Sequence, residues 1–515
     1  MTDSALLSPP LPRDAKTRSF WNAPHGSATA LAIAAAARAR VGVIVAVTHD
    51  THAAHTLETD LRAFAGATLD VLHFPDWETL PYDLYAPHPD IVSQRIATLY
   101  RLPTTTRGVL VVPASTLMQR LAPRSFIGGS SLVLRLKQVL DLAAEQRRLE
   151  AAGYRNVPQV LEPGDFAVRG SLLDVFPMGS AEPFRIELFD REIESIRTFD
   201  PETQRSAHKV EAVNLLPGRE FPLTDDAVKA FRNTLRERFP IDPRRCPIYQ
   251  DIREGTTPAG IEYYLPLFFD HTETLFDYLG ESATFVLADG ALDAAETFWQ
   301  QAQARYESRA HDIERPIVPV TELYLSPQEL REKLNRSLRV EIVAKGTNAH
   351  AVDLGTQPAP SVPLNQRGES TAQELKRFLD AYPGRVLIAA DSAGRREALI
   401  EQLGATGLHP HVVGSWREFV HDLEGGAAPA VNRFAITVAT LDDGFALTSP
   451  ALTVLTDRQL YGERARSTRR RKHAIREPEA ILRDLSELTI GAPIVLADHG
   501  VGRYQGLLKL DVGAA

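Results

Sequence analysis

Apolar and polar residues alternate along residues 184–199 of the chain. This period-two pattern is typical of β-strands with one buried and one solvent-facing side. Asp190 and Arg191 interrupt the pattern as a tight turn and divide it into two strands. A more continuous apolar run at residues 172–176, which Pro177 ends, supplies another strand. The pattern therefore predicts a small antiparallel sheet.

Elsewhere in the chain the pattern switches between helix and strand. The alanine-rich segment 27–40 predicts a helix, and the continuous apolar runs at 41–48 and 109–113 predict buried strands. This order favours an α/β domain with a partly parallel sheet. The remaining predicted elements are helices at 91–100 (with Asp90 as its N-cap), 140–152, 371–381, 393–403 and 480–488, and strands at 284–288, 385–390, 434–439 and 452–456.

The outer face of the small sheet has an unusual composition for a solvent-facing surface. On the strand pattern, Arg169 and Arg185 project into solvent, and Phe189 lies at a strand end where its ring need not be buried. Arginine beside an exposed aromatic ring is a common composition of protein interfaces. The alternative is that both arginines only confer solubility and that Phe189 belongs to the core. The pattern alone favours this alternative.

Length and composition are those of a multidomain globular protein. A chain of 515 residues predicts about three or four domains. Its hydrophobic content of 44% and charged content of 24% are ordinary. Cys246 is the only cysteine, which excludes a disulfide framework or a cysteine-based zinc site and fits a reducing cytoplasm.

The sequence indicates neither export nor membrane insertion. The amino terminus has an early acidic residue and several prolines, where a signal peptide would need a basic start and an unbroken apolar core. The longest apolar stretch, residues 28–47, is interrupted by Arg38 and Arg40. It therefore predicts a helix followed by a strand, and no membrane partner is expected.

Candidate catalytic and metal-binding groups are few. His49, His52 and His55 are spaced by three, which could align two imidazoles on one helix face. No carboxylate or cysteine completes a ligand set, so exposed histidines near a helix start are the favoured interpretation. The chain has no nucleophile elbow, no paired acid and base carboxylates and no Walker-type motif. The sequence therefore predicts no catalytic, ATP-binding or metal-binding residue.

A basic run lies between residues 459 and 484. The net charge of −9 argues against a nucleic-acid footprint over the whole surface but not against a local one. A run of this length is more often a solvated linker than a nucleic-acid site. Its basic residues are Arg464, Arg466, Arg469, Arg470, Arg471, Lys472 and Arg476.

The sheet-forming segment carries a family resemblance. Its sequence from Arg169 to Arg205, RGSLLDVFPMGSAEPFRIELFDREIESIRTFDPETQR, closely resembles a segment shared by the nucleotide-excision-repair protein UvrB and the transcription-repair coupling factor (Mfd) family. In that family the segment belongs to a small domain that docks onto UvrA. The resemblance implies that Arg169, Arg185 and Phe189 contact UvrA.

Other segments resemble the same family in the same order. Residues 77–83 (WETLPYD) resemble a coupling-factor signature, and residues 259–269 (AGIEYYLPLFF) resemble the family's AGIEYWLPLFF. Residues 499–504 (HGVGRY) resemble the opening strand and turn of the family's RNA-polymerase-interacting domain. The resemblance covers nearly the whole chain and is to the amino-terminal half of a coupling factor.

The resemblance implies a multidomain α/β fold. Its expected parts are a degenerate P-loop-like UvrB-type domain, an inserted small α+β UvrA-binding domain, a separate small α/β domain and the truncated start of a small β-barrel. The expected boundaries are 1–125 with 214–345 for the UvrB-like domain, 126–213 for the UvrA-binding domain, 346–369 for a linker, 370–457 for the small α/β domain, 458–488 for a basic linker and helix, and 489–515 for the start of the RNA-polymerase-interacting domain.

Residues 22–29 (NAPHGSAT) occupy the position of the phosphate-binding loop of UvrB-like proteins. Such a loop needs glycines for close backbone approach and a lysine for the phosphates, and no Gly-Lys-Ser/Thr occurs here. We therefore expect a degenerate nucleotide fold that does not bind ATP and a chain without a cofactor. On the resemblance, ATP and Mg²⁺ serve helicase-type lobes that the family carries beyond the position of Ala515.

The carboxyl-terminal segment resembles only the beginning of the polymerase-binding domain. The resemblance assigns RNA polymerase binding to His499, Gly500, Gly502, Arg503 and Tyr504. A piece of about 25 residues cannot close a barrel or bury a core. Polymerase binding by this chain alone is therefore not expected.

The function that the resemblance implies is transcription-coupled nucleotide excision repair in the cytoplasm. The family displaces RNA polymerase stalled at DNA lesions by ATP-driven translocation and recruits UvrA. This chain is expected to supply UvrA docking and autoinhibition, with DNA contacted through the full-length protein. One alternative is a UvrB-like damage-binding ATPase, which would need a lysine-bearing phosphate loop and a second helicase lobe. The other is a generic DNA-binding protein acting through the basic residues at 464–476.

Overall fold

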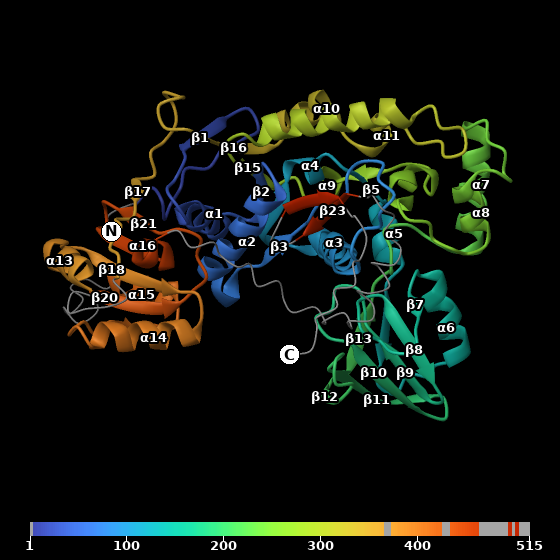
Figure 1. The fold of residues 1–515 in the computed structure, drawn as a ribbon, viewed down its shortest axis with the longest axis horizontal. Helices are drawn as coiled ribbons and strands as arrows, with labels where there is room; N and C mark the ends of the chain where they lie inside the picture. The colour runs from blue at the N-terminus through green and yellow to red at the C-terminus, as the bar shows by residue number, and fades with distance from the viewer. Residues whose placement is uncertain (1–3, 365–371, 425–432, 463–492, 497–499, 504–515) are drawn as a thin grey trace, which may run out of the picture. The chain divides into compact units, whose positions relative to one another are not determined.

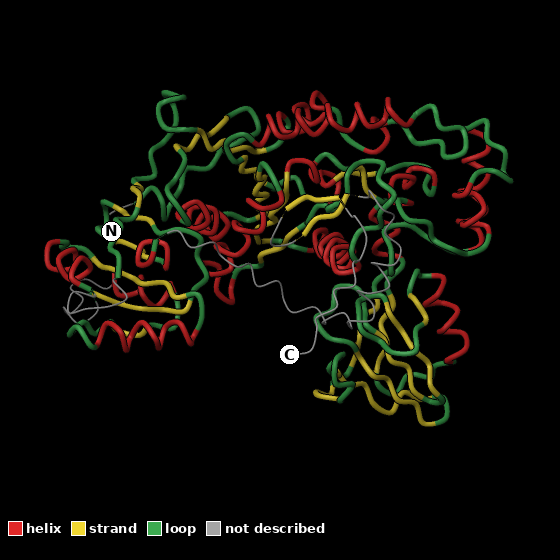
Figure 2. Tube along the Cα trace, viewed as in Figure 1, coloured by secondary structure: helices red, strands yellow, loops and turns green. Residues whose placement is uncertain are grey.

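The computed structural model describes residues 4–364, 372–424, 433–462, 493–496 and 500–503 (Figure 1). The chain divides into two compact units, residues 1–464 and 465–515, which are described separately. Strands and helices both occur in the first unit, which contains three six-stranded sheets. The coarse expectation of a mixed α/β multidomain fold is confirmed. Figure 2 shows that helices and strands are interleaved along much of the first unit.

The first sheet is parallel throughout and has the strand order β1-β16-β15-β2-β4-β3. Its strands come from two distant parts of the chain, one before residue 114 and one after residue 283. Every residue of β2 is buried, as its continuous apolar run predicts. The bounds are β1 (Arg18–Asn22), β2 (Gly42–Thr48), β3 (Val71–His73), β4 (Arg107–Pro113), β15 (Thr284–Leu287) and β16 (Leu338–Val343), with helices α1 (Ala28–Ala39), α2 (Thr51–Ala65) and α3 (Pro89–Arg101).

The second sheet lies in the segment between those two parts and has the order β12-β11-β10-β9-β8-β7. All of its pairs are antiparallel except β7 with β8. The predicted hairpin is confirmed, with the turn at Asp190 and Arg191. The bounds are β7 (Arg155–Asn156), β8 (Asp165–Arg169), β9 (Leu172–Val175), β10 (Phe184–Phe189), β11 (Glu192–Phe199) and β12 (Ser206–Lys209), with helix α6 (Leu142–Ala151) and the separate pair β6 (Leu132–Arg135) and β13 (Ala212–Leu215).

The third sheet has the order β17-β21-β22-β18-β20-β19. Its central strand β18 is parallel to both neighbours, whereas β17 pairs antiparallel with β21. Strand β17 lies within the stretch that composition predicts as a linker. The bounds are β17 (Thr356–Pro358), β18 (Arg385–Ala390), β19 (His411–Val412), β20 (Phe434–Val438), β21 (Phe445–Leu447) and β22 (Leu452–Leu455), with helices α13 (Gln373–Ala381), α14 (Ala393–Gly404), α15 (Trp416–Glu424) and α16 (Asp457–Tyr461).

Further helices and short strands complete the first unit, and a strand pair is described in the second. The pair is β23 (Pro493–Leu496) with β24 (Gly500–Arg503), which run antiparallel. The remaining elements of the first unit are η1 (Gly66–Thr68), η2 (Leu102–Thr104), α4 (Ala114–Leu117), β5 (Arg120–Leu121), α5 (Arg124–Gly129), α7 (Asp225–Arg238), α8 (Pro247–Arg253), η3 (Ile261–Leu267), β14 (Glu273–Thr274), α9 (Leu275–Tyr278), α10 (Ala291–Arg309), α11 (Val320–Leu323) and α12 (Pro327–Asn335).

Among the helices of the described residues, none is both long enough and apolar enough to cross a membrane.

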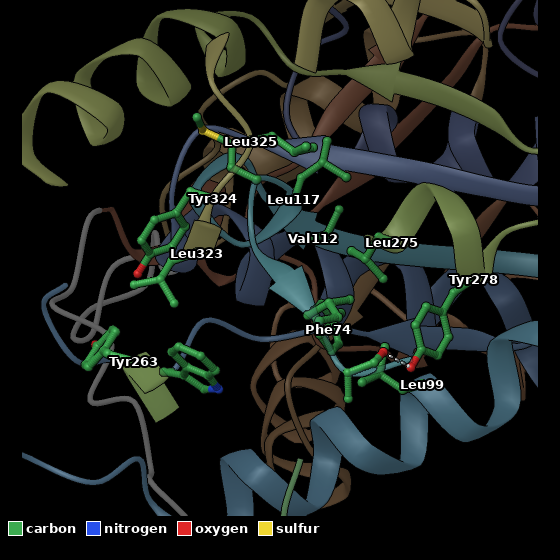
Figure 3. Packing of buried hydrophobic residues seen from close by; sticks show 14 of the residues in the cluster. Phe74, Leu99, Val112, Leu117, Tyr263, Leu275, Tyr278, Leu323, Tyr324 and Leu325 are labelled. Atoms are coloured by element: carbon green, nitrogen blue, oxygen red, sulfur yellow. Dashed lines mark hydrogen bonds between the residues drawn. The ribbon is translucent and has the colours of Figure 1, made fainter. Parts of the chain in front are cut away.

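Helix α3 joins the first and second sheets. Ile96 packs into the core under the second sheet, whereas Leu99 packs with Phe74 and Tyr278 in the core of the first (Figure 3). The helix begins at Pro89, and its cap is the His88 ring, whose Nδ1 accepts a hydrogen bond from the Asp90 amide. The expectation that Asp90 caps this helix is therefore wrong, because the helix starts at Pro89, two residues before the predicted start at residue 91.

A buried ion pair reinforces the same junction. Arg95 of α3 is fully buried, and its Nε and Nη2 lie 2.5 and 3.1 Å from the two carboxylate oxygens of Glu220. Its guanidinium also lies over the rings of Phe74 and Trp77, 4.2 and 4.8 Å from their centroids. Burying this charge is tolerable because the pair is bidentate and the cation also contacts aromatic faces. Glu220 follows the second-sheet segment in sequence. The ion pair therefore links the chain that leaves this segment to α3.

Candidate protein-docking surface

Strand register places Arg169, Arg185 and Phe189 on one side of the second sheet. Arg185 and Phe189 are four residues apart on β10, and side chains of a strand return to the same face every second residue. Arg185 pairs with Asp174 and Arg169 pairs with Leu172, and these two partners share a face of β9. We call this outward side of β8, β9 and β10 the docking face. The opposite side carries the buried Ile186 and faces the core.

Phe189 is strongly exposed to solvent. Its exposed fraction of 73% is large for an aromatic residue. Phe189 ends β10, and the next residue, Asp190, takes a positive φ of 57° in the turn. The expectation that its ring is exposed at a strand end is confirmed, and the alternative that it belongs to the core is wrong. An aromatic side chain has few rotatable bonds, so it loses little conformational freedom on binding.

Arg185 is held inside the protein to a greater extent than the strand pattern predicts. Its guanidinium makes two hydrogen bonds of 2.8 Å to the Asp174 carboxylate and one of 3.1 Å to the Gln204 carbonyl. It also lies 4.8 Å from the centroid of the Phe199 ring. Its side chain is 22% exposed and that of Asp174 is 4% exposed. The expectation of a freely solvent-projecting Arg185 is wrong, because a buried carboxylate on the neighbouring strand binds it.

The network around Arg185 fixes its charge. The hydrogen bond to Asp174 raises the pKa of Arg185 above its already high ordinary value, so the side chain stays cationic. The small core beneath it on the docking face contains Val160, Ala167, Phe176 and Phe199. Arg185 is therefore a positioned cation over a small buried apolar core. Such a cation can bind an acidic group on a partner without first being ordered.

Arg169 lies at the end of β8, beside a shallow recess. The side chain is exposed and donates a hydrogen bond to the Pro158 carbonyl. Gly170 follows with a positive φ of 61° in the turn to β9, a conformation that favours glycine. The recess has a volume of about 400 Å³ and is lined by Asn156, Val157, Pro158, Ala167, Val168 and Arg169. The sequence pattern gave no signal for this recess, since it depends on how the loop after β7 packs.

The other candidate sites are described only in part. Gly500, Gly502 and Arg503 lie on β24, whereas His499 and Tyr504 lie outside the described residues. The basic run at 464–476 and the helix predicted at 480–488 also lie outside them. The structure therefore adds to these expectations only the backbone pairing of β23 with β24.

The histidines singled out by sequence do not form one group. His49, His52 and His55 are exposed around the start of α2, as expected. His55 instead approaches Glu58 and His73, and the potential ligand atoms of these three residues lie within 4.8 Å of one another.

The contacts of Glu58 favour a structural role for this cluster. The pKa of Glu58 is lowered to about 2, because hydrogen bonds from His73 and Arg62 outweigh the opposing effect of burial. Its carboxylate lies 2.8 Å from His73 Nδ1 and 2.7 Å from Arg62 Nη2. Since a guanidinium already binds the carboxylate that a cation would need, we assign the cluster to tying α2 to β3.

The residues at the phosphate-loop position do not fit a nucleotide. Ser27 is the N-cap of α1, and no lysine lies between residues 22 and 29. A Cβ at Gly26 would lie only 2.3 Å from the Gly444 carbonyl oxygen, so the protein's own backbone occupies the space next to this loop. No step of a nucleotide reaction is therefore assigned to this position.

Comparison with known families identifies two parts of the chain. Residues 132–221 match the UvrB interaction domain, and residues 378–460 match the D3 domain of MFD. The first match contains the docking face, and the second contains β18 to β22 of the third sheet. Fold and site together define the class as a multidomain α/β protein that carries a UvrB interaction domain.

Relatives extend the similarity to nearly the whole chain. Transcription-repair-coupling factors from Haemophilus influenzae and Escherichia coli are each 38% identical to it, over 99% and 95% of this chain. That of Myxococcus xanthus is 30% identical over 91% of it. Over nearly its whole length the chain is therefore similar to transcription-repair-coupling factors. It spans less than half of these curated relatives, namely 44%, 42% and 41% of their lengths.

Proposed function

We propose that this chain docks onto UvrA through the docking face and so contributes UvrA recruitment to transcription-coupled nucleotide excision repair. The observation that carries the proposal is the exposed ring of Phe189 on the same face as Arg169 and Arg185, within the segment that matches the UvrB interaction domain. An aromatic anchor with flanking arginines is the composition of an energetically dominant interface patch. The relatives' printed name supports the cellular process.

The wider role is assigned to the family's whole proteins. In this proposal they displace RNA polymerase stalled at DNA lesions, contact DNA and use ATP and Mg²⁺ in parts outside the matched region, in the bacterial cytoplasm. This chain supplies UvrA docking and autoinhibition. Its polymerase-binding residues are proposed to be His499, Gly500, Gly502, Arg503 and Tyr504.

We further propose a division of the chain into functional parts. Residues 1–125 and 214–345 form a nucleotide fold that has lost nucleotide binding, and residues 126–213 form the UvrA-binding domain. The first sheet supports this division, since β1 to β4 precede the second sheet in sequence and β15 and β16 follow it. The remaining parts are a linker at 346–369, a small α/β domain at 370–457, a basic linker and helix at 458–488 and the start of a polymerase-binding domain at 489–515.

Replacement of Phe189 tests the docking assignment most directly. Phe189→Ala should weaken UvrA binding by about tenfold or more, because a hot-spot aromatic contributes at least about 1–2 kcal/mol. Isothermal titration calorimetry with purified UvrA measures the change. The matched control is Leu161→Ala, which removes a half-exposed apolar side chain near the start of β8, whereas Arg169 lies at the end of that strand.

Arg185 needs a different experiment, because its side chain also stabilises the fold. Arg185→Ala would leave the buried Asp174 carboxylate without its cation, so a loss of binding could follow from unfolding. Its thermal melt must therefore be measured beside its affinity for UvrA. Unchanged affinity in both Phe189→Ala and Arg169→Ala would refute the docking assignment.

A further inference from the structure

The residues just before α1 contact a loop of the third sheet where a phosphate loop would bind its ligand. The Ser27 amide donates a hydrogen bond of 3.1 Å to the Asp443 carbonyl, and the Asp443 amide donates one of 3.3 Å to Ser27 Oγ. An N-cap hydroxyl ordinarily accepts from its own helix. Ser27 makes no such bond, so its side chain serves the contact with the loop.

Glycine is required for this approach. Gly26 has a positive φ of 52°, and a Cβ on it would lie 2.3 Å from the Gly444 carbonyl oxygen and 2.9 Å from that of Asp443. A glycine that lets another backbone approach closely is also what a phosphate loop uses. Here a peptide carbonyl takes the position instead of an anion.

Neighbouring residues hold the same segments together. The His25 amide donates a hydrogen bond of 3.1 Å to Thr356 Oγ1 on β17. Asp60 of α2 accepts one of 2.8 Å from the Asp442 amide. Each of these bonds joins residues more than 300 positions apart in the chain.

Apolar packing extends the contact beyond hydrogen bonds. The Phe64 ring of α2 lies edge-on to Trp416 of α15, 5.2 Å between centroids, and 6.3 Å from Phe445 of β21. These residues belong to one buried core that combines α1 and α2 with the third sheet. Contacts of this kind resemble a domain interior more than a transient surface contact.

The carboxylate of Asp443 turns back into its own domain. Its Oδ1 accepts hydrogen bonds from the Gly444 amide and from Gln459 Nε2, 2.9 and 2.7 Å away. Its Oδ2 lies 3.4 Å from Arg458 Nη1. The loop therefore presents its backbone to α1 in a conformation that its own side chains fix.

We propose that the vestigial phosphate loop at residues 25–27 is an intramolecular docking site for the 442–444 loop. We call this contact the α1 latch. It closes the nucleotide position and fixes the third sheet against α1 and α2. The lost nucleotide site thus retains a binding role, with a protein backbone as its ligand.

Hydrogen exchange with residue-level mass spectrometry tests the latch in the unaltered chain. Amides of a helix N-terminus ordinarily lack an acceptor and exchange quickly. The amides of Ser27 and Asp443 should both be protected. Exchange of either amide at the rate of an unstructured peptide would overturn the proposal, and this readout requires no variant to fold.

A pair of glycine variants supplies the second measurement. Gly26→Ala should speed exchange about tenfold or more in residues 27–31 and 441–445 together. The matched control is Gly290→Ala, since Gly290 also has a positive φ, also precedes a helix and has open space around its Cβ position. An effect of Gly26→Ala that is confined to 27–31, or equal to that of the control, would contradict the latch.

Discussion

For single residues, whether a side chain is exposed depends on burial and on its partners, which the sequence pattern does not specify. For Phe189 the strand pattern alone favoured a core position, and only the family resemblance favoured the exposed position that the structure shows at the end of β10. The alternation along β10 also failed for Arg185, because the Asp174 that binds it lies on another strand, paired in a register that the pattern does not specify. Charge pairs between strands are therefore the part of the docking face that could not be predicted.

Glu262 gives a prediction at the same scale. Burial raises the pKa of this carboxyl to about 7 from an ordinary 4.5. Between these pH values the unfolded chain loses the proton while the folded protein keeps it, so stability falls as the pH rises through this window and is constant above it. Glu262→Gln should therefore leave stability nearly unchanged at pH 4 and raise it by about 3 kcal/mol at pH 8.

Urea denaturation at both pH values measures this difference. The exposed Glu281→Gln is the control for a change of charge without burial. A variant of Glu262 whose stability relative to the unaltered chain does not depend on pH would contradict the assignment of a buried neutral carboxyl.

At the scale of elements, segments with strong local patterns were predicted and those shaped by distant contacts were not. The predicted helix at 27–40 and strand at 385–390 agree with α1 and β18 to within a residue or two. Helix α15 was missed, although Trp416, Phe419 and Val420 carry the helical spacing that could have revealed it. Strand β17 has three residues and exists through its pairing with β21, so composition alone predicted a linker there.

Substitutions on helix α3 should destabilise one domain or the other, depending on which core the changed residue packs into. Ile96→Ala should destabilise the second-sheet domain, and Leu99→Ala the first-sheet domain, each by about 2–4 kcal/mol through the cavity it leaves. Hydrogen exchange should therefore rise mainly in residues 165–199 for the first variant and in residues 42–48 for the second. Equal effects of both variants on both segments would show that the two cores unfold as one.

For the whole molecule, the family resemblance supplied what physical patterns did not. Patterning predicted α/β domains and a small sheet, but only the resemblance supplied UvrA as a partner and a vestigial nucleotide fold. The contact between the third sheet and α1 had no signal in the sequence, since it joins residues 26 and 444 through backbone atoms.

The whole chain should bind no nucleotide. Titration with MgATP in a calorimeter should give no saturable heat, and phosphate release should not exceed background, because residues 22–29 lack a lysine and Gly26 abuts the Gly444 carbonyl. UvrA binding by the same sample serves as the control that the protein is folded. Stoichiometric MgATP binding would contradict both the degenerate fold and the α1 latch.

The strand order of the first sheet also constrains the sequence of events during synthesis. Strand β1 at Arg18–Asn22 pairs with β16 at Leu338–Val343, so the ribosome must make more than 300 further residues before this edge of the sheet can close. The strands of the second sheet all emerge before that point. Since domains generally fold as units during translation, the segment that carries the docking face can be complete while the first sheet is still open. The nascent chain would then carry a folded docking face before the first sheet is complete.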